Sequence, residues 1–359
     1  MKTAYIAPFS MDSLRGTPIR ARNMFRALCE ISEAHLIAHC ARSVRAAQER
    51  LHETGACGLF SFTGKTLKIL RATRPDVLHG CTSASVFPMF IYKLCFSWKV
   101  RIVYELHGWA WYEQRDSGRP LVRLIFHTFD HIGLWFSSGI IVVSKTYKEF
   151  LSRKITPERL AVIWDAAEFD VPFVPPPARK GIIVGYLGGA GWWQGLTFII
   201  GAAEKLQKRD DIRFLVAGFE PKDKKLFPEL PNVLYPGFVK REHVVETIRS
   251  CDVMLSTRVE ETSGNLLFPL KLAEYMAAGR PVISSGAGDQ VEIIRSANCG
   301  IVVTPISSTA LADAIGEFAA KPYEGRVEMA RRAHSYARQH LLYPSLKKKL
   351  ETFYRRFGL

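Results

Sequence analysis

The stretch EETSGNLLFPLKLAEYMAAGRP at residues 260–281 predicts a turn, a helix and a sharp stop. Residues 262–265 are turn formers, and Pro269 suits the first turn of a helix, where its missing N–H is not needed. Gly279 and Pro281 end the helix before the next strand. Because a helix N-terminus carries free N–H groups and the positive end of the helix dipole, it favours an anion. Alone, the stretch also fits an ordinary connection between a helix and a strand.

The composition is that of a globular protein with about two domains. The chain has 359 residues, of which 48% are hydrophobic, so it can form an ample core. Its first ten residues do not have the pattern of a signal peptide, and no apolar run reaches the roughly 18 residues of a membrane-spanning helix. The seven cysteines are scattered without CxxC spacing, which favours reduced thiols in a cytoplasmic protein over disulfides or a zinc site.

The net charge of +15 is high and uneven. Residues 1–180 contain 25 Lys and Arg against 15 Asp and Glu, a balance of +10, and the remainder contains 24 against 19, a balance of +5. A basic surface favours an anionic partner. Zinc-finger, RNP-like and basic-zipper patterns do not occur, so we expect no nucleic-acid partner. Phosphorylated substrates or anionic lipid headgroups fit the charge better.

Strand and helix patterns alternate through the first half of the chain. The predicted strands are 4–9, 35–40, 76–79, 100–106 and 140–144, and the predicted helices are 17–29, 59–71, 83–95 and 119–136. Alternation at this spacing predicts βαβ units, and therefore a parallel sheet with helices on both faces.

The Pro-rich segment 171–180, VPFVPPPARK, interrupts this alternation and predicts a stiff linker. Beyond it the predicted strands are 181–187, 212–217, 232–235, 253–256 and one from residue 282. The predicted further helices are 196–208, 242–250, 291–296, 307–318, 326–340 and 345–357, and the segment 300–303 lies between two of them. We therefore expect tandem doubly wound α/β domains at 1–170 and 181–340, and a C-terminal helix at 341–359 that packs back toward the first domain. Ligands of such folds bind beyond the carboxyl ends of strands and in clefts between domains.

Several short motifs argue against common alternatives. The sequence GAGWWQ at 189–194 nearly spells GxGxxG, but Gln194 replaces the third glycine, which argues against a dinucleotide site. A turn at Gly189 can still bring a phosphate close to backbone N–H groups. His127 and His131 share one helical face, where their apolar neighbours favour packing over metal binding. Asp-x-Asp, GxSxG and Walker sequences do not occur, which weakens hydrolase and NTPase interpretations.

His107 lies in VYELHGWAWYE, just past the carboxyl end of a predicted strand. An α/β domain displays functional groups at this position, so His107 is a candidate site residue, and a structural or solvated histidine is the alternative. Gly16 follows the first strand and has Arg15 beside it, and an ordinary turn is its alternative.

Taken together, these residues resemble the family 4 glycosyltransferases of the GT-B fold over nearly the whole chain. The resemblance is strongest over 181–305, where FPLKLAEYMAAGRPVI at 268–283 is similar to the family's nucleotide-sugar helix. Further matches are VGYLG at 184–188, WQG at 193–195, FLVAG at 214–218, PGFV at 236–239, SCDVML at 250–255, ELHG at 105–108, IVVS at 141–144 and the loop at Gly16.

The resemblance implies a role for each matching position in the second half. Glu274 corresponds to the second Glu of the family's Glu-x7-Glu motif and would bind the ribose hydroxyls of a donor nucleotide. Val239 would read the base through its backbone. Leu266 and Leu267 would lend backbone N–H groups near the diphosphate.

The resemblance also implies that His107 lies beside the transferred sugar and that Gly16 closes over the donor from the other domain. The family is metal-independent and generally retains the anomeric configuration. We therefore expect no cofactor and no metal, with a nucleotide diphosphate sugar as co-substrate.

The chain departs from the family pattern in three places. The first Glu of Glu-x7-Glu falls on Leu266, and the Arg and Lys near the first loop of the C-terminal domain are replaced, with Gly189 in that loop and Gln194 in place of the Lys. An Asn-Gly pair is replaced by Asp165 and Ala166. The leaving diphosphate must be stabilised without a metal. Arg258, Lys271 and Arg15 are the candidates for this charge, and a solvated surface role is the alternative for each.

The sequence thus predicts a glycosyltransferase that moves a hexose to a hydroxyl acceptor, either a glycan or a lipid-linked molecule. A sugar-nucleotide epimerase of the same fold and a non-catalytic nucleotide-sugar-binding protein are the alternatives. The basic, aromatic segments 121–136 and 93–101 favour a peripheral position on the inner face of the cell membrane, and an internal core helix is the alternative for 121–136. The expected catalytic residues are His107 and Glu274, and the expected donor-binding residues are Gly16, Gly189, Gln194, Val239, Arg258, Asn265, Leu266, Leu267, Lys271 and Glu274.

Overall fold

The computed structural model describes residues 1–13, 16–44, 48–113, 118–220, 223 and 227–357. By their internal contacts the residues form two compact units, of which the first comprises Met1–Trp164 with Tyr343–Leu359 and the second comprises Asp165–Leu342. The first unit therefore ends six residues before the expected boundary at 170. The Pro-rich segment 171–180 belongs to the second unit, where the carbonyls of Val174 and Pro176 accept hydrogen bonds from Arg280 and Tyr323.

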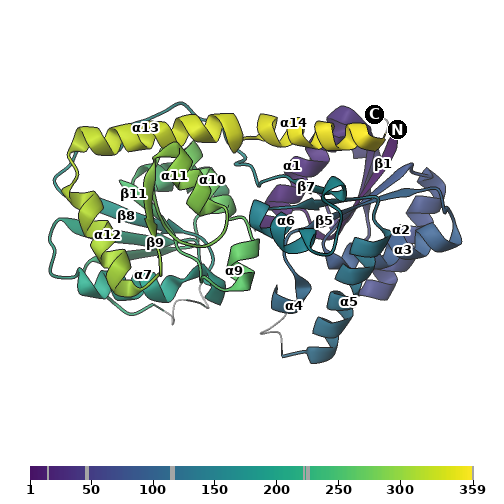
Figure 1. Cartoon of the computed structure of the whole chain (residues 1–359), viewed down its shortest axis with the longest axis horizontal. Coiled ribbons are helices and arrows are strands. Elements are labelled where there is room, and N and C mark those ends of the chain that lie inside the picture. The colour runs from purple at the N-terminus through teal and green to yellow at the C-terminus, as the bar shows by residue number, and fades with distance from the viewer. Residues whose placement is uncertain (14–15, 45–47, 114–117, 221–222, 224–226, 358–359) are drawn as a thin grey trace. The chain divides into compact units, whose positions relative to one another are not determined.

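The first unit contains a parallel sheet with the strand order β3-β2-β1-β4-β5-β6-β7. Its central strands are buried along almost their whole length, because helices cover both faces of the sheet (Figure 1). The strands are β1 (Lys2–Ser10), β2 (Glu33–Cys40), β3 (Leu51–Glu53), β4 (Val77–Cys81), β5 (Arg101–Leu106), β6 (Gly139–Val142) and β7 (Leu160–Val162).

The helices of the first unit agree with the predicted alternation. They are α1 (Gly16–Ile31), α2 (Leu59–Thr73), α3 (Val86–Cys95), α4 (Ala110–Glu113), α5 (Pro120–Phe136), α6 (Lys145–Ser152) and α14 (Tyr343–Tyr354). The sequence patterns missed the four-residue helix α4, the helix α6, whose composition is polar, and the three-residue strands β3 and β7. The Ser144 hydroxyl caps α6 by accepting from the Tyr147 N–H at 2.9 Å. The expected packing of a C-terminal helix on the first unit is confirmed, since α14 packs on α1.

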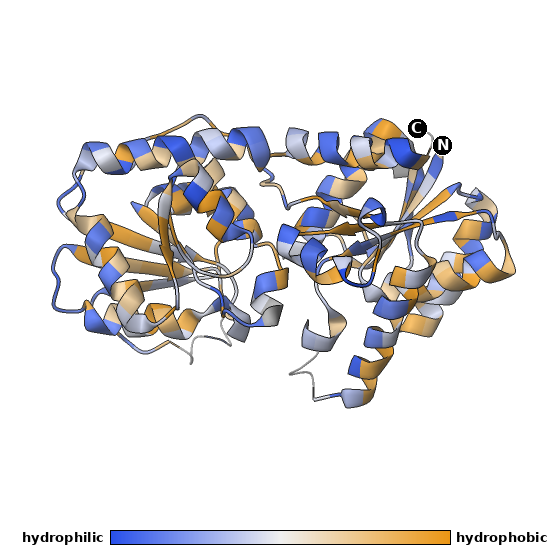
Figure 2. Ribbon diagram, viewed as in Figure 1, coloured by the Kyte–Doolittle hydropathy of each residue, from blue (hydrophilic) through white to orange (hydrophobic). Residues whose placement is uncertain are grey.

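The second unit contains a parallel sheet with the order β10-β9-β8-β11-β12-β13. Its strands are mostly hydrophobic (Figure 2) and pack with helices into one apolar core. The strands are β8 (Ile182–Leu187), β9 (Ile212–Ala217), β10 (Val233–Gly237), β11 (Val253–Ser256), β12 (Val282–Ser285) and β13 (Gly300–Val303). The helices are α7 (Leu196–Lys205), α8 (Val244–Arg249), α9 (Thr262–Leu266), α10 (Leu270–Ala277), α11 (Gln290–Ala297), α12 (Ser308–Ala320) and α13 (Tyr323–His340).

The stretch 260–281 forms two helices where the sequence predicted a turn and one helix. The expected turn at 262–265 is wrong, because these residues form α9. The Asn265 side chain stabilises this conformation by donating to the Glu260 carbonyl and accepting from the Gly288 N–H. Such tertiary contacts override the local turn preference. The predicted helix follows as α10, and Gly279 ends it with φ +76.

The parallel register brings the loops after several strands to one edge of the second sheet. Val184 of β8 pairs with Val253 of β11, and Met254 of β11 pairs with Val282 of β12. The chain therefore leaves these three strands side by side, at Gly188, Thr257 and Gly286. This is the edge where α/β folds bind their ligands. Among the described residues, no helix is long and apolar enough to cross a membrane.

Candidate functional site

Glu274 lies on the buried face of α10, and 8% of its surface is exposed. Its Oε1 accepts a hydrogen bond from Arg241 Nη1 at 2.6 Å, and Arg241 also forms an ion pair with Glu168 at 3.0 Å. Burial raises the pKa of Glu274, while the Arg241 guanidinium counteracts this shift. Among the described residues Oε2 of Glu274 has no hydrogen-bond partner. That oxygen can therefore accept hydrogen bonds from hydroxyl groups of a ligand.

Lys271, one turn before Glu274 on α10, reaches the loop after β8. Its Nζ donates to Gln194 Oε1 at 2.7 Å and to the Tyr186 hydroxyl at 2.9 Å. A Cβ at position 188 would lie 2.9 Å from this Nζ, so Gly188 leaves the space that the ammonium occupies. The Lys271 amine thus lies at the side chain of Gln194, the position where the resemblance to family 4 would place a lysine.

Arg258 follows β11 and lies in the same charged neighbourhood. It is 5% exposed, and its Nε and Nη1 have no hydrogen-bond partner among the described residues. Burial lowers the pKa of Arg258 to about 10. Burial and then the charge of Arg258 lower the pKa of Lys271 well below its ordinary value. A buried guanidinium with unused N–H groups beside a second cation favours an anionic ligand, because such groups are costly to leave unpaired.

The other predicted donor residues of the second unit fall into two groups. Gly189 lies in the loop after β8, and a Cβ at this position would meet no atom within 4 Å. Val239 lies in the loop after β10, where Gly237 turns the chain with φ +78. The remaining residues belong to the packing around α9. The Asn265 amide is held inside the protein by Glu260 and Gly288, Leu266 is 3% exposed, and Leu267 connects α9 to α10.

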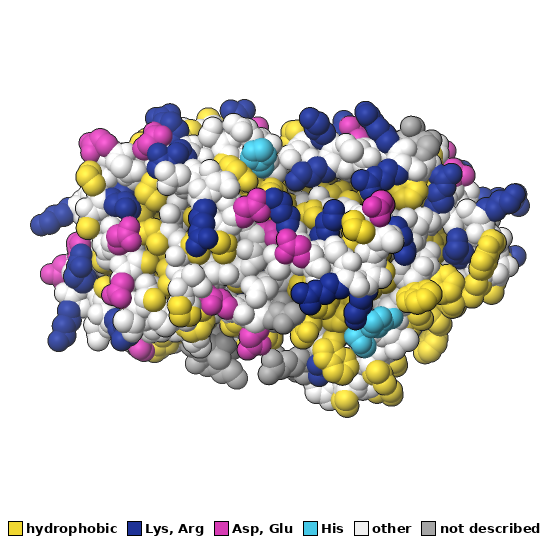
Figure 3. Space-filling view, viewed as in Figure 1, with side chains coloured by type: hydrophobic (Ala, Val, Ile, Leu, Met, Phe, Trp, Pro, Cys, Tyr) yellow, Lys and Arg dark blue, Asp and Glu magenta, His cyan; other side chains and the backbone are white. Residues whose placement is uncertain are grey.

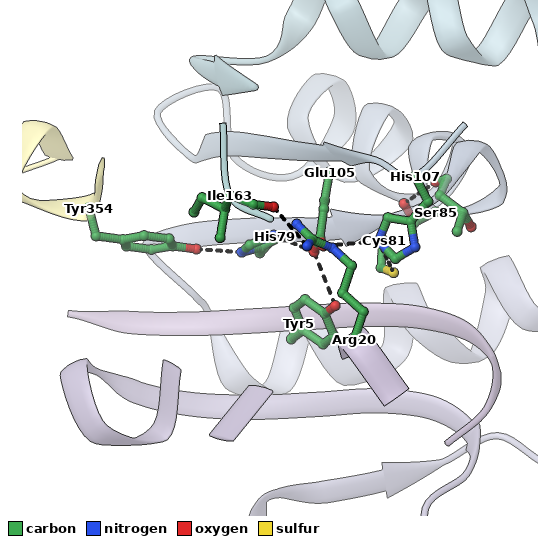
Figure 4. Close-up of polar contacts among 10 residues, drawn as sticks. Tyr5, Arg20, His79, Cys81, Ser85, Glu105, His107, Ile163 and Tyr354 are labelled. Atoms are coloured by element: carbon green, nitrogen blue, oxygen red, sulfur yellow. Dashed lines mark hydrogen bonds and ion pairs between the residues drawn. The ribbon is translucent and has the colours of Figure 1, made fainter. Parts of the chain in front are cut away.

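His107 of the first unit lies just beyond β5, and its Nε2 is 2.9 Å from Glu105 Oε1 and 3.4 Å from Cys81 Sγ (Figure 4). Burial disfavours its charged form, but the neighbouring Cys81 sulfur and Glu105 carboxylate raise the pKa of His107 to about 10. The ring is therefore an imidazolium at neutral pH. Among the described residues its Nδ1 has no hydrogen-bond partner, so this N–H can donate to a substrate.

Glu105 is fully buried and is the centre of a polar network. Arg20 of α1 donates from Nε to Glu105 Oε1 at 2.5 Å and from Nη1 to the Ile163 carbonyl at 2.8 Å. The Tyr5 hydroxyl and His79 contact Glu105 Oε2 at 3.1 and 3.2 Å. Although burial opposes ionisation, Arg20 and His107 hold the pKa of Glu105 well below its ordinary value. The carboxylate that orients His107 is thus fixed by partners on both of its oxygens.

Asp130 of α5 holds the chain that follows His107. Its carboxylate accepts from the Tyr104 hydroxyl at 2.6 Å and from the Ala110 N–H at 2.8 Å. The Ser83 hydroxyl donates to the same carboxylate at 2.5 Å. Burial raises the pKa of Asp130 to about 6. These bonds fix the loop between β5 and α4, on which His107 lies.

Three groups in the first unit have the spacing that a metal ion could use. The ligand atoms of Cys81, Glu105 and His107 lie within 4.8 Å of one another. However, Glu105 Oε1 is already bound by Arg20, and a divalent cation there would face the guanidinium charge. The residues present do not fit a metal, and they form a hydrogen-bonded group instead.

The structure separates the predicted residues into two sets. Lys271, Gln194, Arg258 and Glu274 gather in the second unit, whereas His107 and Gly16 belong to the first. Gly16 begins α1 and is exposed, and a Cβ there would meet no atom within 4 Å. Arg15 lies outside the described residues.

Sequence reasoning did not find Arg20, Arg241 or the role of Glu105. Glu105 could have been found, because it lies two residues before His107, on the same face of an extended chain. Arg20 is 85 residues from Glu105, and Arg241 is 33 residues from Glu274. No local pattern indicates such pairs.

The fold and the site together define a protein of two α/β units whose second unit has cationic side chains beyond the carboxyl ends of its strands. Residues 31–167 match the family described as Glycosyltransferase Family 4, and residues 181–321 match the family described as Glycosyl transferases group 1. The chain belongs to the family 4 glycosyltransferases, which have the GT-B fold.

Individual proteins show the same relationship. An uncharacterized glycosyltransferase of Methanocaldococcus jannaschii is 27% identical over 207 residues. The match covers 52% of this chain and 52% of that protein, so it spans about half the length of each. Sucrose-phosphate synthase from Thermosynechococcus elongatus has a TM-score of 0.75 at 17% identity, with 100% of this chain and 99% of the other covered. Anabaena HepE in complex with UDP-glucose has a TM-score of 0.73 at 16% identity, with 99% of each chain covered. The two solved structures are similar in fold.

Proposed function

We propose that the protein is a glycosyltransferase that moves a hexose from a nucleotide diphosphate sugar to a hydroxyl acceptor. The observation that carries this proposal is Arg258, a buried guanidinium with unpaired Nε and Nη1 whose charge acts on Lys271. Two adjacent cations at the carboxyl edge of a parallel sheet fit a diphosphate. The solved structure of the similar HepE in complex with UDP-glucose supports the same ligand class.

The proposed roles follow from the charge that develops during transfer. The bond between the anomeric carbon and the diphosphate breaks, and its electron pair remains on the diphosphate. Arg258 and Lys271 stabilise that negative charge without a metal. The acceptor oxygen forms the new bond to the anomeric carbon, and its proton passes to the departing diphosphate oxygen. Glu274 Oε2 accepts from the ribose hydroxyls, and Val239 contacts the base through its backbone.

His107 would donate from Nδ1 to the sugar during transfer. The Glu105 carboxylate on its Nε2 keeps the imidazolium charged, so the ring acts as a hydrogen-bond donor and not as a base. Retention of the anomeric configuration follows from the resemblance to family 4, and nuclear magnetic resonance of the product would test it.

A panel of UDP-, GDP- and ADP-hexoses tests the proposal. One of them should raise the unfolding temperature, because a ligand at about 100 times its Kd adds about 2.7 kcal/mol to the stability of the folded state. The same nucleotide sugar should be transferred to an acceptor or slowly hydrolysed. Thermal stability unaffected by every donor would contradict the site. Binding without turnover would indicate a binding protein, and isomerisation of the donor without an acceptor would indicate an epimerase.

We also propose that the first unit presents a membrane-facing surface to a lipid-linked acceptor. Leu121, Leu124 and Trp135 on one face of α5 are 68%, 53% and 80% exposed. Leu94 in the last turn of α3 and Phe96 and Trp98 just after it are exposed, and Lys99 and Arg101 follow in sequence. Figure 3 shows hydrophobic side chains gathered over this part of the unit. Apolar side chains with nearby cations are typical of binding to an anionic lipid surface.

Sedimentation with anionic liposomes at low salt tests this surface. The protein should sediment with vesicles that contain anionic lipid and should be released by salt. Leu124→Glu should abolish sedimentation. Leu234→Glu in the second unit is the matched control, because Leu234 is equally apolar and 62% exposed. If both variants sediment like the parent protein, α5 does not contact the membrane.

A further inference from the structure

A continuous row of buried side chains connects the C-terminal helix α14 to His107 (Figure 4). The Tyr354 hydroxyl is 2.8 Å from His79 Nδ1, and His79 Nε2 is 3.2 Å from Glu105 Oε2. Glu105 Oε1 is 2.9 Å from His107 Nε2. Tyr354, His79 and Glu105 are completely buried. The four side chains therefore form one hydrogen-bond chain that is closed to solvent at the helix end and reaches the reaction site at His107.

The chemistry of the groups fixes the direction of every bond in this chain. An ionised Glu105 can only accept, so His79 donates from Nε2. Burial lowers the pKa of His79, so the ring is neutral and its Nδ1 accepts from the Tyr354 hydroxyl. His107 donates from Nε2 to the other oxygen of the carboxylate. The carboxylate cannot rotate without breaking a bond at both of its oxygens.

The packing of α14 places the Tyr354 hydroxyl at this point. Tyr343 donates to Glu30 of α1 at 2.6 Å, and Lys347 forms an ion pair with the same carboxylate at 2.6 Å. A Cβ at Gly139 would lie 2.6 Å from the Phe353 ring, so the absence of a side chain there lets α14 approach β6. The Tyr354 ring also stacks on His79 with 6.0 Å between centroids. Tyr354, which lies 275 residues after His79 in the chain, thus completes the hydrogen-bonded surroundings of Glu105.

We propose that Glu105, His79 and Tyr354 are positioning residues that hold His107 in its reactive orientation. Through Tyr354, α14 thereby contributes to the transfer site. This inference rests on the proposed function for its effect on turnover. The groups that face the chain from the packed elements are Tyr5 of β1, Arg20 of α1 and Cys81 of β4. None of these three residues is substituted in the variants below.

The first test removes single atoms from each end of α14. Tyr354→Phe deletes the buried hydroxyl and keeps the ring, whereas Tyr343→Phe deletes the hydroxyl that binds Glu30 at the surface. Both variants should fold, and both should bind the nucleotide sugar as the parent protein does. Tyr354→Phe should lower kcat about tenfold, the effect expected when a catalytic group loses its orientation. Tyr343→Phe should leave kcat unchanged, because the Lys347 ion pair with Glu30 and the contact of Phe353 with Gly139 still hold α14.

A double-mutant cycle separates positioning from a general loss of stability. In a His107→Asn background, Tyr354→Phe should cause no further loss of kcat, because its effect acts through the imidazole. A full additional tenfold loss in that background would overturn the inference.

The second test observes His107 directly and needs no substrate. The imidazole titration is followed by nuclear magnetic resonance in the parent protein and in each variant. Glu105→Gln should lower the titration midpoint of His107 by about one pH unit or more, because a nearby negative charge favours the imidazolium. Tyr354→Phe should lower it by less, since a poorly oriented carboxylate stabilises the cation less. Tyr343→Phe should not change it.

An unchanged His107 titration in both Tyr354→Phe and Glu105→Gln would overturn the inference even if the enzyme is active. If the parent protein neither binds nor turns over any nucleotide sugar, the proposed function fails instead. The titration then still decides whether the chain from α14 controls His107.

Discussion

The two units differ in whether their buried charges have partners within the protein. In the first unit Glu105 is surrounded by Arg20, His107, His79 and Tyr5, and both of its oxygens are occupied. In the second unit the cations Arg258 and Lys271 are neighbours, and Arg258 keeps two buried nitrogens without a partner. Both arrangements are expensive to bury, but only the first is satisfied by the protein itself.

From this difference we expect the polar network of the first unit to be ordered without a ligand and the cations of the second unit to be stabilised by one. The network around Glu105 fixes a geometry, as expected for a group that must be oriented for reaction. The cations of the second unit repel one another until an anion joins them. We therefore expect substitutions in the second unit to affect ligand binding more than folding, and the predictions below test that expectation.

The largest effect is expected for Arg258→Met. Removal of the guanidinium should lower kcat/KM for the donor by about 10²–10³-fold, the loss seen when a group that stabilises developing charge is removed. Because an unpaired buried charge is also removed, the free energy of unfolding should stay equal or rise by about 1 kcal/mol. Denaturant unfolding and initial-rate kinetics measure the two quantities.

Arg280→Met is the matched control in the same unit. Arg280 is also buried, but it donates to the carbonyls of Cys251, Val174, Gly279 and Arg249. Its loss should destabilise the protein by about 3–5 kcal/mol, because buried acceptors lose a charged partner. If Arg258→Met lowers the free energy of unfolding as much as Arg280→Met does, the proposed contrast between a hydrogen-bonded and an unpaired buried guanidinium is wrong.

A smaller loss is expected for Glu274→Ala. The donor should bind about 10- to 100-fold more weakly, since charged hydrogen bonds to hydroxyls contribute about 1.5–3 kcal/mol each. The fold should persist, because Arg241 keeps its ion pair with Glu168. Isothermal titration calorimetry measures the affinity. A donor affinity equal to that of the parent protein would remove Glu274 from the site.

Lys271 should change its protonation when the donor binds. Burial and Arg258 lower the pKa of Lys271 in the free protein, and a bound diphosphate would raise it again. At pH values between the pKa of Lys271 in the free protein and its pKa in the complex, donor binding should therefore take up protons, at most about one per site, and affinity should fall as pH rises through that range. Calorimetry in two buffers with different ionisation enthalpies measures the uptake.

Lys271→Arg provides the control for this prediction, because an arginine stays charged and should bind the donor without proton uptake. Equal heats in both buffers for the parent protein would show that Lys271 is already protonated or does not contact the ligand.

The smallest effect is expected for Gly189→Ala. A Cβ at this position meets no atom within 4 Å in the protein, so stability should change by less than about 0.5 kcal/mol. If a phosphate approaches the backbone here, the methyl group should still weaken donor binding a few-fold, as thermal shift titration would show. Unchanged affinity would indicate that the phosphate lies elsewhere, and Gly188→Ala, which would displace the Lys271 ammonium, then tests the adjacent position.

Much of the architecture could be read from the chain because it depends on local patterns. The alternation of apolar segments predicted the parallel sheets, and Gly279 with Pro281 marked the end of α10. The same reasoning failed at 262–265, where Asn265 and Gly264 favour a turn locally but contacts with Glu260 and Gly288 favour a helix. Short or polar elements such as β7 and α6 also have too weak a pattern to be recognised.

The sequence by itself was enough to predict the fold class and the family, and it singled out Glu274, His107, Arg258 and Lys271 as candidate site residues. Only the tertiary structure decided how they are paired. It placed the Lys271 ammonium at Gln194, Arg241 on Glu274, and Tyr354 behind His79. Strand and helix patterns reflect neighbours a few residues apart, whereas a buried charge finds its partner through space, and that partner can lie anywhere in the chain.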